Sequence, residues 1–239
     1  AHVPAECSRY FSLDGQQPNL WAPISGLYAC GADLGEPGWL RIHANFEHHR
    51  DGVLRLLGLP TGATTTRQQV ADALQGWTAQ VVEDRAAALG LVVAAARSPQ
   101  AWLAHPQNVA VAAQPLVSIT QLDRDRPAVP RDWPEPTQPR PLNGLRVLDL
   151  TRILAGPVAA RSLAAQGADV LMLNGPGLPN IEAIAQMSRG KRSALLDLKS
   201  TQGQSPMAAL LGQAHVLLQG YRPGPLAALG LGTQASAPV

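Results

Sequence analysis

The chain has 239 residues, of which 46% are hydrophobic and 15% are charged, and its formal net charge is +2. This length allows one or two domains with cores of their own, and the composition excludes an intrinsically disordered chain. The balanced charge argues against nucleic acid or a membrane surface as the main partner, and no apolar run is long enough to span a bilayer.

The first part of the chain, residues 1–122, is predicted to form a small α+β domain. Apolar side chains alternate over two short segments, and helical spacing of apolar residues follows Ser or Thr at several candidate helix starts. Strands are expected at residues 39–43 and 91–96, and helices at 51–59, from Thr66 onward, at 78–89 and at 100–104. The four tryptophans in this part, Trp21, Trp39, Trp77 and Trp102, are expected to anchor its core.

A change in composition marks the expected domain boundary. Residues 123–141 contain six prolines and show no apolar periodicity. Such a segment favours extended polyproline geometry and acts as a semi-rigid connector. We therefore expect a linker at 123–141 and a second domain at 142–239.

The second domain is predicted to be a partial doubly wound, Rossmann-like α/β domain. Short apolar runs alternate here with helical patterns, which is typical of parallel strands joined by crossover helices. Strands are expected at residues 145–150, 168–173, 193–198 and 215–219, and helices at 156–167 and 206–213, with another helix start at Pro225.

Ligands of open α/β sheets bind where the carboxyl ends of the strands meet loops and helix N-termini. Three segments of this sequence occupy such positions, at residues 151–157, 197–200 and 220–224. Lys199 and Arg222 add positive charge to two of them, which suits phosphate groups. The alternative is that the glycines only make tight turns and that these two side chains only solvate the surface.

The remaining polar residues point to no cofactor or metal. The two cysteines, Cys7 and Cys30, form neither a disulfide framework nor a four-ligand metal site, which favours a cytoplasmic protein. His43, His48 and His49 lie close together, but their spacing lacks a persuasive third ligand for zinc. Lys191 and Lys199 are the only lysines beside seventeen arginines, which suggests sites that need a compact ammonium group.

Several motifs of the second domain, taken in order, resemble the class III CoA-transferase family. The resemblance rests on RPLNGLRVLDLTRILAGP at 140–157, GADV at 167–170, RGKRS at 189–193, LDLK at 196–199 and QGYRPG at 219–224. This family includes formyl-CoA and carnitine CoA-transferases and alpha-methylacyl-CoA racemase. Residues 1–122 resemble, less tightly, the smaller domain of the family, so the order suggests a fragment of a double-length member.

The resemblance implies a site for CoA or acyl-CoA and no metal. It assigns three backbone contacts to the CoA moiety and places two further segments at its adenosine and phosphate end. The residues are Ile153, Leu154 and Ala155, then Leu196, Asp197, Leu198 and Lys199, and finally Gly220, Tyr221 and Arg222. Two departures stand out, because Asn174 and Ala228 occupy positions where the family often has basic residues.

The resemblance also implies transfer of CoA between an acyl-CoA and a carboxylic acid by an interlocked homodimer. The family's catalytic Asp, which attacks the acyl-CoA carbonyl, is expected beyond Val239, and Asp169 is not its equivalent. The fragment alone is therefore expected to be inactive. Two alternatives stay open: an acyl-CoA racemase or epimerase of the same family, and a non-catalytic CoA-binding or dimer-scaffolding piece.

Overall fold

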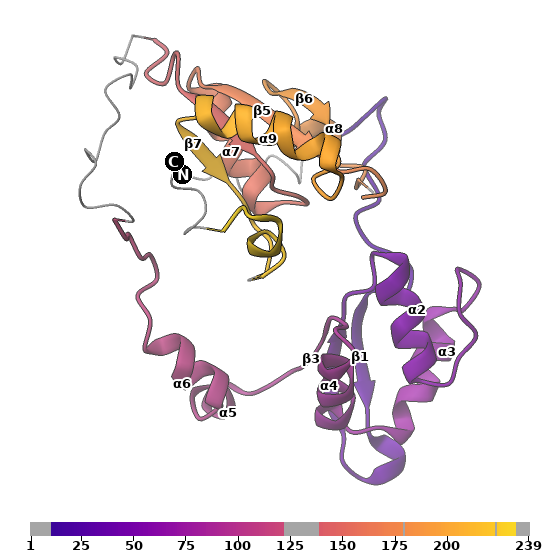
Figure 1. The fold of residues 1–239 in the computed structure, drawn as a ribbon. Helices are drawn as coiled ribbons and strands as arrows, with labels where there is room; N and C mark the ends of the chain where they lie inside the picture. Colours follow the sequence, from indigo (N-terminus) through magenta and orange to yellow (C-terminus); the bar gives the residue numbers. More distant parts are fainter. Residues whose placement is uncertain (1–10, 122–138, 179, 223, 233–239) are drawn as a thin grey trace. The chain divides into compact units, whose positions relative to one another are not determined.

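The computed structural model describes residues 11–121, 139–178, 180–222 and 224–232 (Figure 1). Two compact units are present, one formed by residues 19–118 and the other containing the chain from residue 119 onward. The predicted linker at 123–141 lies, up to residue 138, outside the described residues. The two units are described separately below.

The unit at residues 19–118 is built on a three-stranded antiparallel sheet with the order β1-β2-β3. Its strands are β1 (Gly26–Cys30), β2 (Gly38–Ile42) and β3 (Val93–Ala95). Its α-helices are α2 (Glu47–Leu56), α3 (Arg67–Ala73), α4 (Ala79–Ala88), α5 (Pro99–Leu103) and α6 (Pro106–Ala112), and two short 3-10 turns are η1 (Ala32–Leu34) and η2 (Leu74–Gly76).

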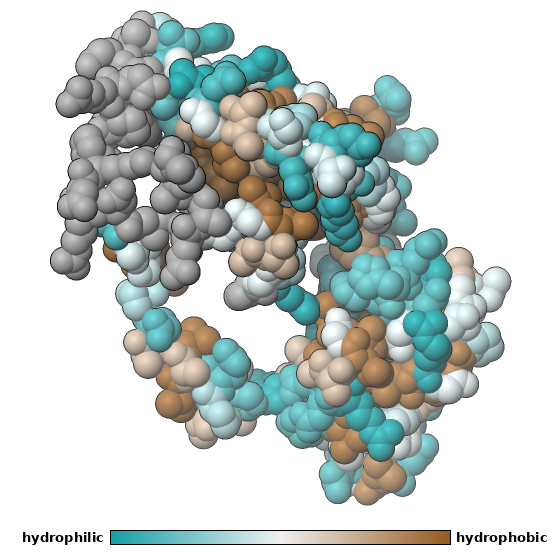
Figure 2. Space-filling model, in the orientation of Figure 1, coloured by the Kyte–Doolittle hydropathy of each residue, from teal (hydrophilic) through white to brown (hydrophobic). Residues whose placement is uncertain are grey.

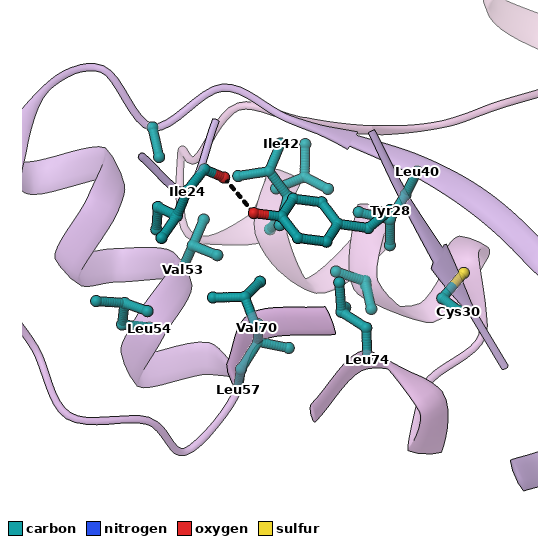
Figure 3. Packing of buried hydrophobic residues seen from close by; sticks show 14 residues of the cluster. Ile24, Tyr28, Cys30, Leu40, Ile42, Val53, Leu54, Leu57, Val70 and Leu74 are labelled. Atoms are coloured by element: carbon teal, nitrogen blue, oxygen red, sulfur yellow. Dashed lines mark hydrogen bonds between the residues drawn. The ribbon is translucent and has the colours of Figure 1, made fainter. Parts of the chain in front are cut away.

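The core of this unit lies between one face of the sheet and helices α2, α3 and α4 (Figure 3). Tyr28 lies inside it, and its hydroxyl donates a hydrogen bond of 2.8 Å to the carbonyl of Ile24. Leu40 and Ile42 from β2 are fully buried beside it. Because alternate residues of β1 and β2 face this core, the sheet buries one face and exposes the other.

Local signals predicted several ends of these elements correctly. Thr66 and Gln69 form the predicted capping box of α3, and Thr78 caps α4 through the amide of Val81. The expected helix at 51–59 instead begins at Glu47, so its first turn is more polar than the periodicity suggested. The strand β1 was not predicted.

The tryptophans differ from the prediction. Of the four tryptophans expected to anchor this core, only Trp77 packs against it, whereas Trp21, Trp39 and Trp102 expose 53%, 56% and 41% of their surface. The Trp21 ring instead receives the Arg41 guanidinium at 4.6 Å from its centroid. An amphipathic ring gains from such a cation while one of its sides stays in water.

The unit after residue 119 contains a four-stranded parallel sheet with the order β6-β5-β4-β7. Its strands are β4 (Arg146–Asp149), β5 (Asp169–Asn174), β6 (Arg192–Leu195) and β7 (Val216–Leu218). Its helices are α7 (Ala155–Ala165), α8 (Ile184–Met187) and α9 (Thr201–Gln213), followed by the 3-10 turn η3 (Ala227–Leu229).

Helices cover both faces of this sheet. Val147 and Val170 point toward α7, where Ala160 is buried against them, whereas Leu148 and Leu173 belong to a second cluster with Met207 of α9. Successive strand residues thus alternate between two cores, as in a doubly wound domain. The predicted fold class, a partial doubly wound α/β domain preceded by a small α+β domain, is confirmed.

The boundaries of the later elements were predicted less well. The helix expected at 206–213 begins at Thr201, because Ser200 caps it through the amide of Gly203 and Pro206 lies within it. The helix expected from Pro225 is only the short turn η3. Among the described residues, no helix combines the length and apolar character needed to cross a bilayer.

Apolar side chains also lie on exposed surfaces. Helices α5 and α6 bury none of their residues, and Leu103 and Val109 expose 67% and 61% of their surface. Figure 2 shows hydrophobic surface, in brown, over this part of the chain. In the parallel sheet, all four residues of the edge strand β6 are exposed.

Candidate functional site at the carboxyl edge of the parallel sheet

The strand order decides which of the expected site segments are neighbours. The segment 153–155 follows β4, and 220–222 follows β7, the strand paired with β4. Residues 196–199 follow β6, which lies at the opposite edge of the sheet from β7. With strands about 4.8 Å apart, the chain ends of β6 and β7 are separated by roughly 14 Å.

The order also places a topological switch point between β4 and β7. From β4 the chain proceeds through α7 to β5 and β6, and it then returns through α9 to β7 on the other side of β4. The segment after β4 leads to α7 on one face of the sheet, whereas the segment after β7 packs with α9 on the other face. In open α/β sheets, such a divergence creates the crevice in which ligands bind.

The loop after β4 has an unusual backbone. Ile153 has a φ of +73°, in the left-handed region that β-branched residues rarely adopt. Leu154, the residue before α7, has φ −133° and ψ −69°, and no side chain caps the helix. Backbone strain of this kind costs on the order of 1–3 kcal/mol and tends to gather at binding sites.

Two neighbouring contacts hold this loop. The Asp149 carboxylate accepts hydrogen bonds from the Thr151 amide at 2.9 Å and from the Thr151 hydroxyl at 2.5 Å. A Cβ atom on Gly156 would lie only 2.2 Å from the Cβ of Thr151. The loop therefore packs tightly against the first turn of α7, and only glycine fits at position 156.

A small pocket lies beside this loop. Its wall includes Thr151, Arg152 and Met172, together with Asn174 and Asn180. Asn174 ends β5, at the position where the family often has a basic residue. Arg152 lines the same pocket, so a cationic residue and neutral hydrogen-bonding residues lie together in its wall.

The segment 196–199 forms a tight turn into α9. The Asp197 carboxylate accepts a hydrogen bond of 3.0 Å from the Lys199 amide, and the Ser200 hydroxyl bonds to the Asp197 carbonyl at 2.9 Å. Leu196 and Leu198 pack against the core cluster under α9. Asp197 and both leucines thus shape the turn, and the Lys199 side chain is exposed.

The segment 220–222 has a similar division of roles. The Tyr221 amide donates to the Gln219 side chain at 2.9 Å, and the Tyr221 side chain packs against the cluster that contains Leu226. Gly220 and Arg222 are exposed. Neither Lys199 nor Arg222 takes part in an ion pair with another described residue.

Sequence reasoning missed one feature of this site. The Lys191 ammonium lies 2.8 Å from Asp149, and the exposure of both side chains is 0%. The rarity of lysine drew attention to Lys191, but nothing in the local pattern indicated its partner. An aspartate at the end of an otherwise apolar strand was the available signal, because a buried carboxylate requires a partner.

The histidines of the other unit do not form a metal centre with their neighbours. The His48 and His49 rings lie 4.1 Å apart between centroids, and His43 instead contacts the Trp21 ring at 5.6 Å. In the part of the chain that the structure describes, no group of three or more His, Cys, Asp or Glu residues is arranged to hold a metal ion.

Comparisons with known proteins agree with this architecture. Residues 142–238 match the model of CoA-transferase family III. An acyl-CoA transferase of Gibberella moniliformis is 28% identical over 207 residues, covering 83% of this chain and 36% of the relative. A probable fatty acyl-CoA transferase of Mycobacterium tuberculosis is 37% identical over 107 residues, covering 39% of this chain and 27% of the relative.

A third relative is the succinyl-CoA:glutarate CoA-transferase of Mus musculus, which is 34% identical over 106 residues and covers 39% of this chain and 24% of the relative. Residues 142–238 are therefore similar to CoA-transferase family III. The chain spans only about a quarter to a third of the length of these relatives.

Proposed function

We propose that this chain supplies the CoA-binding part of an enzyme that transfers CoA between an acyl-CoA and a carboxylic acid. The observation that carries the proposal is the family match of residues 142–238, together with a switch point at the carboxyl edge of its sheet. The named relatives act on acyl-CoA, and one of them on succinyl-CoA and glutarate.

The proposed ligand contacts divide between backbone and side chains. Residues Ile153, Leu154 and Ala155 meet the CoA moiety through their backbone, in the loop whose conformation is strained and whose helix lacks a side-chain cap. Amide groups at such a helix start favour anionic or carbonyl oxygens. Lys199 and Arg222 supply positive charge toward the phosphates from the two edges of the sheet.

The separation of these two cations fits an elongated ligand. A compact anion would contact both cations only with the two side chains extended toward each other, because β6 and β7 are at opposite edges of the sheet. CoA carries a diphosphate and a separate ribose phosphate, so different phosphates can meet different cations. Leu196, Leu198 and Tyr221 add partly buried apolar surface between them.

The proposal assigns the acyl-transfer step to a residue outside this chain. By the family resemblance, an Asp carboxylate attacks the acyl-CoA carbonyl and CoA thiolate leaves, giving a mixed anhydride. That Asp is expected outside residues 1–239, so the proposal for this chain is CoA binding without turnover. An interlocked homodimer and a cytoplasmic location stay predictions.

Calorimetric titration of the 239-residue chain with CoA and acetyl-CoA tests the proposal. Saturable binding that adenine does not reproduce is expected. Lys199→Ala and Arg222→Ala should each weaken binding by about tenfold, because each removes a charge-assisted hydrogen bond worth about 1.5 kcal/mol.

Arg192→Ala is the matched control for these two variants. Arg192 is also an exposed cation of this unit, but it begins β6, away from the carboxyl edge, and pairs with Asp169. Its loss should leave the affinity nearly unchanged. Equal affinity in the Lys199 and Arg222 variants would show that the site is misplaced, and a folded chain that binds no CoA would contradict the proposal for this chain.

A further inference from the structure

A fully buried ion pair lies directly behind the loop that follows β4. Lys191 is the residue before β6, and its side chain extends past β5 to reach Asp149 at the end of β4, 2.8 Å away. Asp149, Met172 and Ser193 are register partners and therefore share one face of the sheet. The ammonium thus crosses this face to meet the strand that leads into the proposed CoA loop.

The pair acts on the loop through one further residue. One Asp149 oxygen binds Lys191, and the other accepts both hydrogen bonds of Thr151. Thr151 in turn lies against the Cα of Gly156, where a Cβ atom would overlap it. Lys191, Asp149, Thr151 and Gly156 therefore form a continuous series of contacts that spans the strained residue Ile153.

A purely structural role explains this arrangement poorly. Burying two charges costs free energy that their attraction often fails to recover, and apolar residues of similar volume frequently stabilise as well or better. Polar pairs in such positions are best explained when they impose one particular geometry. The geometry imposed here is that of the loop between β4 and α7.

We propose that Lys191 is a positioning residue for CoA binding, acting through Asp149 and Thr151 to hold the backbone of residues 153–155. This proposal rests on the proposed function, because it takes CoA as the ligand. The restraint that Lys191 places on the loop, however, is a property of the ligand-free chain. The two can therefore be tested apart.

Residue-resolved hydrogen exchange of the ligand-free 239-residue chain tests the hold on the loop. In Lys191→Met, the amides of Thr151 and Val158, which donate to the Asp149 carboxylate and to the Leu154 carbonyl, should exchange at least tenfold faster than in the wild type. Amides of β5 serve as the reference in the same sample, because a general loss of stability would accelerate both groups in proportion. Arg192→Met, which removes the neighbouring surface cation, should change neither.

Thr151→Val provides a milder variant in case Lys191→Met does not fold. It keeps a branched side chain against Gly156 but loses the hydroxyl bond to Asp149. Exchange of the amides at positions 151 and 158 should rise in the same direction by a smaller factor. Equal acceleration of β5 and the loop, or no acceleration in either variant, overturns the positioning role.

The Kd for CoA tests whether the conformation of the loop matters for binding. Lys191→Met should raise the Kd for CoA by about tenfold while leaving its dependence on ionic strength unchanged, because the buried ammonium makes no phosphate contact. A weaker dependence on ionic strength would mean that Lys191 binds a phosphate directly, which overturns the proposal. If the wild type binds no CoA while the loop exchange responds selectively, the proposed function fails and the positioning role stands.

Discussion

The two units of this chain use their polar side chains in different ways. In residues 19–118, Thr66, Thr78 and Ser98 cap helices, and the ion pair between Glu83 and Arg97 stays partly exposed. The interior of that unit is one apolar cluster. In the parallel-sheet unit, an ion pair is buried completely beside the candidate site.

The unit at residues 19–118 is built for stability, whereas the parallel-sheet unit contains features expected of a binding site. A single cluster of apolar side chains with capped helices stabilises a fold without any requirement for a ligand. The parallel sheet has two thinner clusters, an exposed edge strand and a strained loop at its carboxyl edge. Such features cost stability, and they are concentrated where the proposed ligand would bind.

The largest change in the free energy of unfolding is expected when one charge is removed from the Lys191–Asp149 pair, compared with the Arg97–Glu83 pair. Asp149→Asn should destabilise the parallel-sheet unit by about 3–5 kcal/mol, because it leaves a buried ammonium unpaired. Glu83→Gln should cost the other unit only about 1 kcal/mol, since the Arg97 side chain remains 15% exposed and can regain water.

Urea unfolding can follow each unit separately. Four of the five tryptophans lie within residues 19–118, so with Trp133→Phe introduced into every protein compared, tryptophan emission monitors that unit. Hydrogen exchange of β4 and β5 monitors the other. Similar losses in the two variants would contradict the distinction between a buried pair and a partly exposed one.

A smaller change in stability is expected from alanine substitutions at two glycines of α9, Gly203 and Gly212. A Cβ on Gly203 would lie 1.9 Å from the Asp197 carbonyl oxygen, so Gly203→Ala must displace the turn that carries Lys199. We expect a loss of about 1–3 kcal/mol, as for other overpacked sites, together with weaker CoA binding. Gly212→Ala in the same helix meets nothing within 4 Å and should stabilise by up to about 1 kcal/mol.

Thermal unfolding followed by circular dichroism compares the two alanine variants directly. Both make the same chemical change in one helix, so their intrinsic helix propensities cancel. If both variants stabilise, the close approach between α9 and the turn at 196–199 is absent in solution.

The features that were predictable from the sequence are those encoded by near neighbours. The strand β4, the helix α7 and the strand β5 follow from apolar runs and turn residues within about thirty positions, and the capping box of α3 needs only four residues. The start of α9 was misplaced because Gly203 and Pro206 resemble helix breakers, although Ser200 caps the helix.

The candidate site was predictable only in part. The three loops could be assigned to strand ends, but their spacing depends on strand order, which placed β6 and β7 at opposite edges. The ion pair joins residues 42 positions apart and depends on the packing of β5 between them. No periodicity or motif in either segment contains that information.

The smallest effect is expected from pH, and it should be confined to the unit at residues 19–118. Burial, and then the charge of Arg41, lower the pKa of His43 below its ordinary value of 6.5. The unfolded chain therefore binds a proton near pH 6.5 while the native unit still excludes it. The stability contributed by neutral His43 is complete above pH 6.5 and is lost as the pH falls from there through the lowered pKa.

Urea unfolding between pH 5 and 8, followed by tryptophan emission, measures this loss, and His43→Gln should reduce it. Arg41→Gln is the second variant, because removing the neighbouring cation should bring the pKa of His43 closer to 6.5 and shrink the pH-dependent loss. The other histidines contribute equally to all three proteins and cancel in the comparison. A pH dependence that is identical in His43→Gln and the wild type would mean that His43 is already protonated or well hydrated in the native unit. Protonation of His43 would then cost residues 19–118 no stability. A charge-dependent cost of burial would be expected only for the Lys191–Asp149 pair of the parallel-sheet unit.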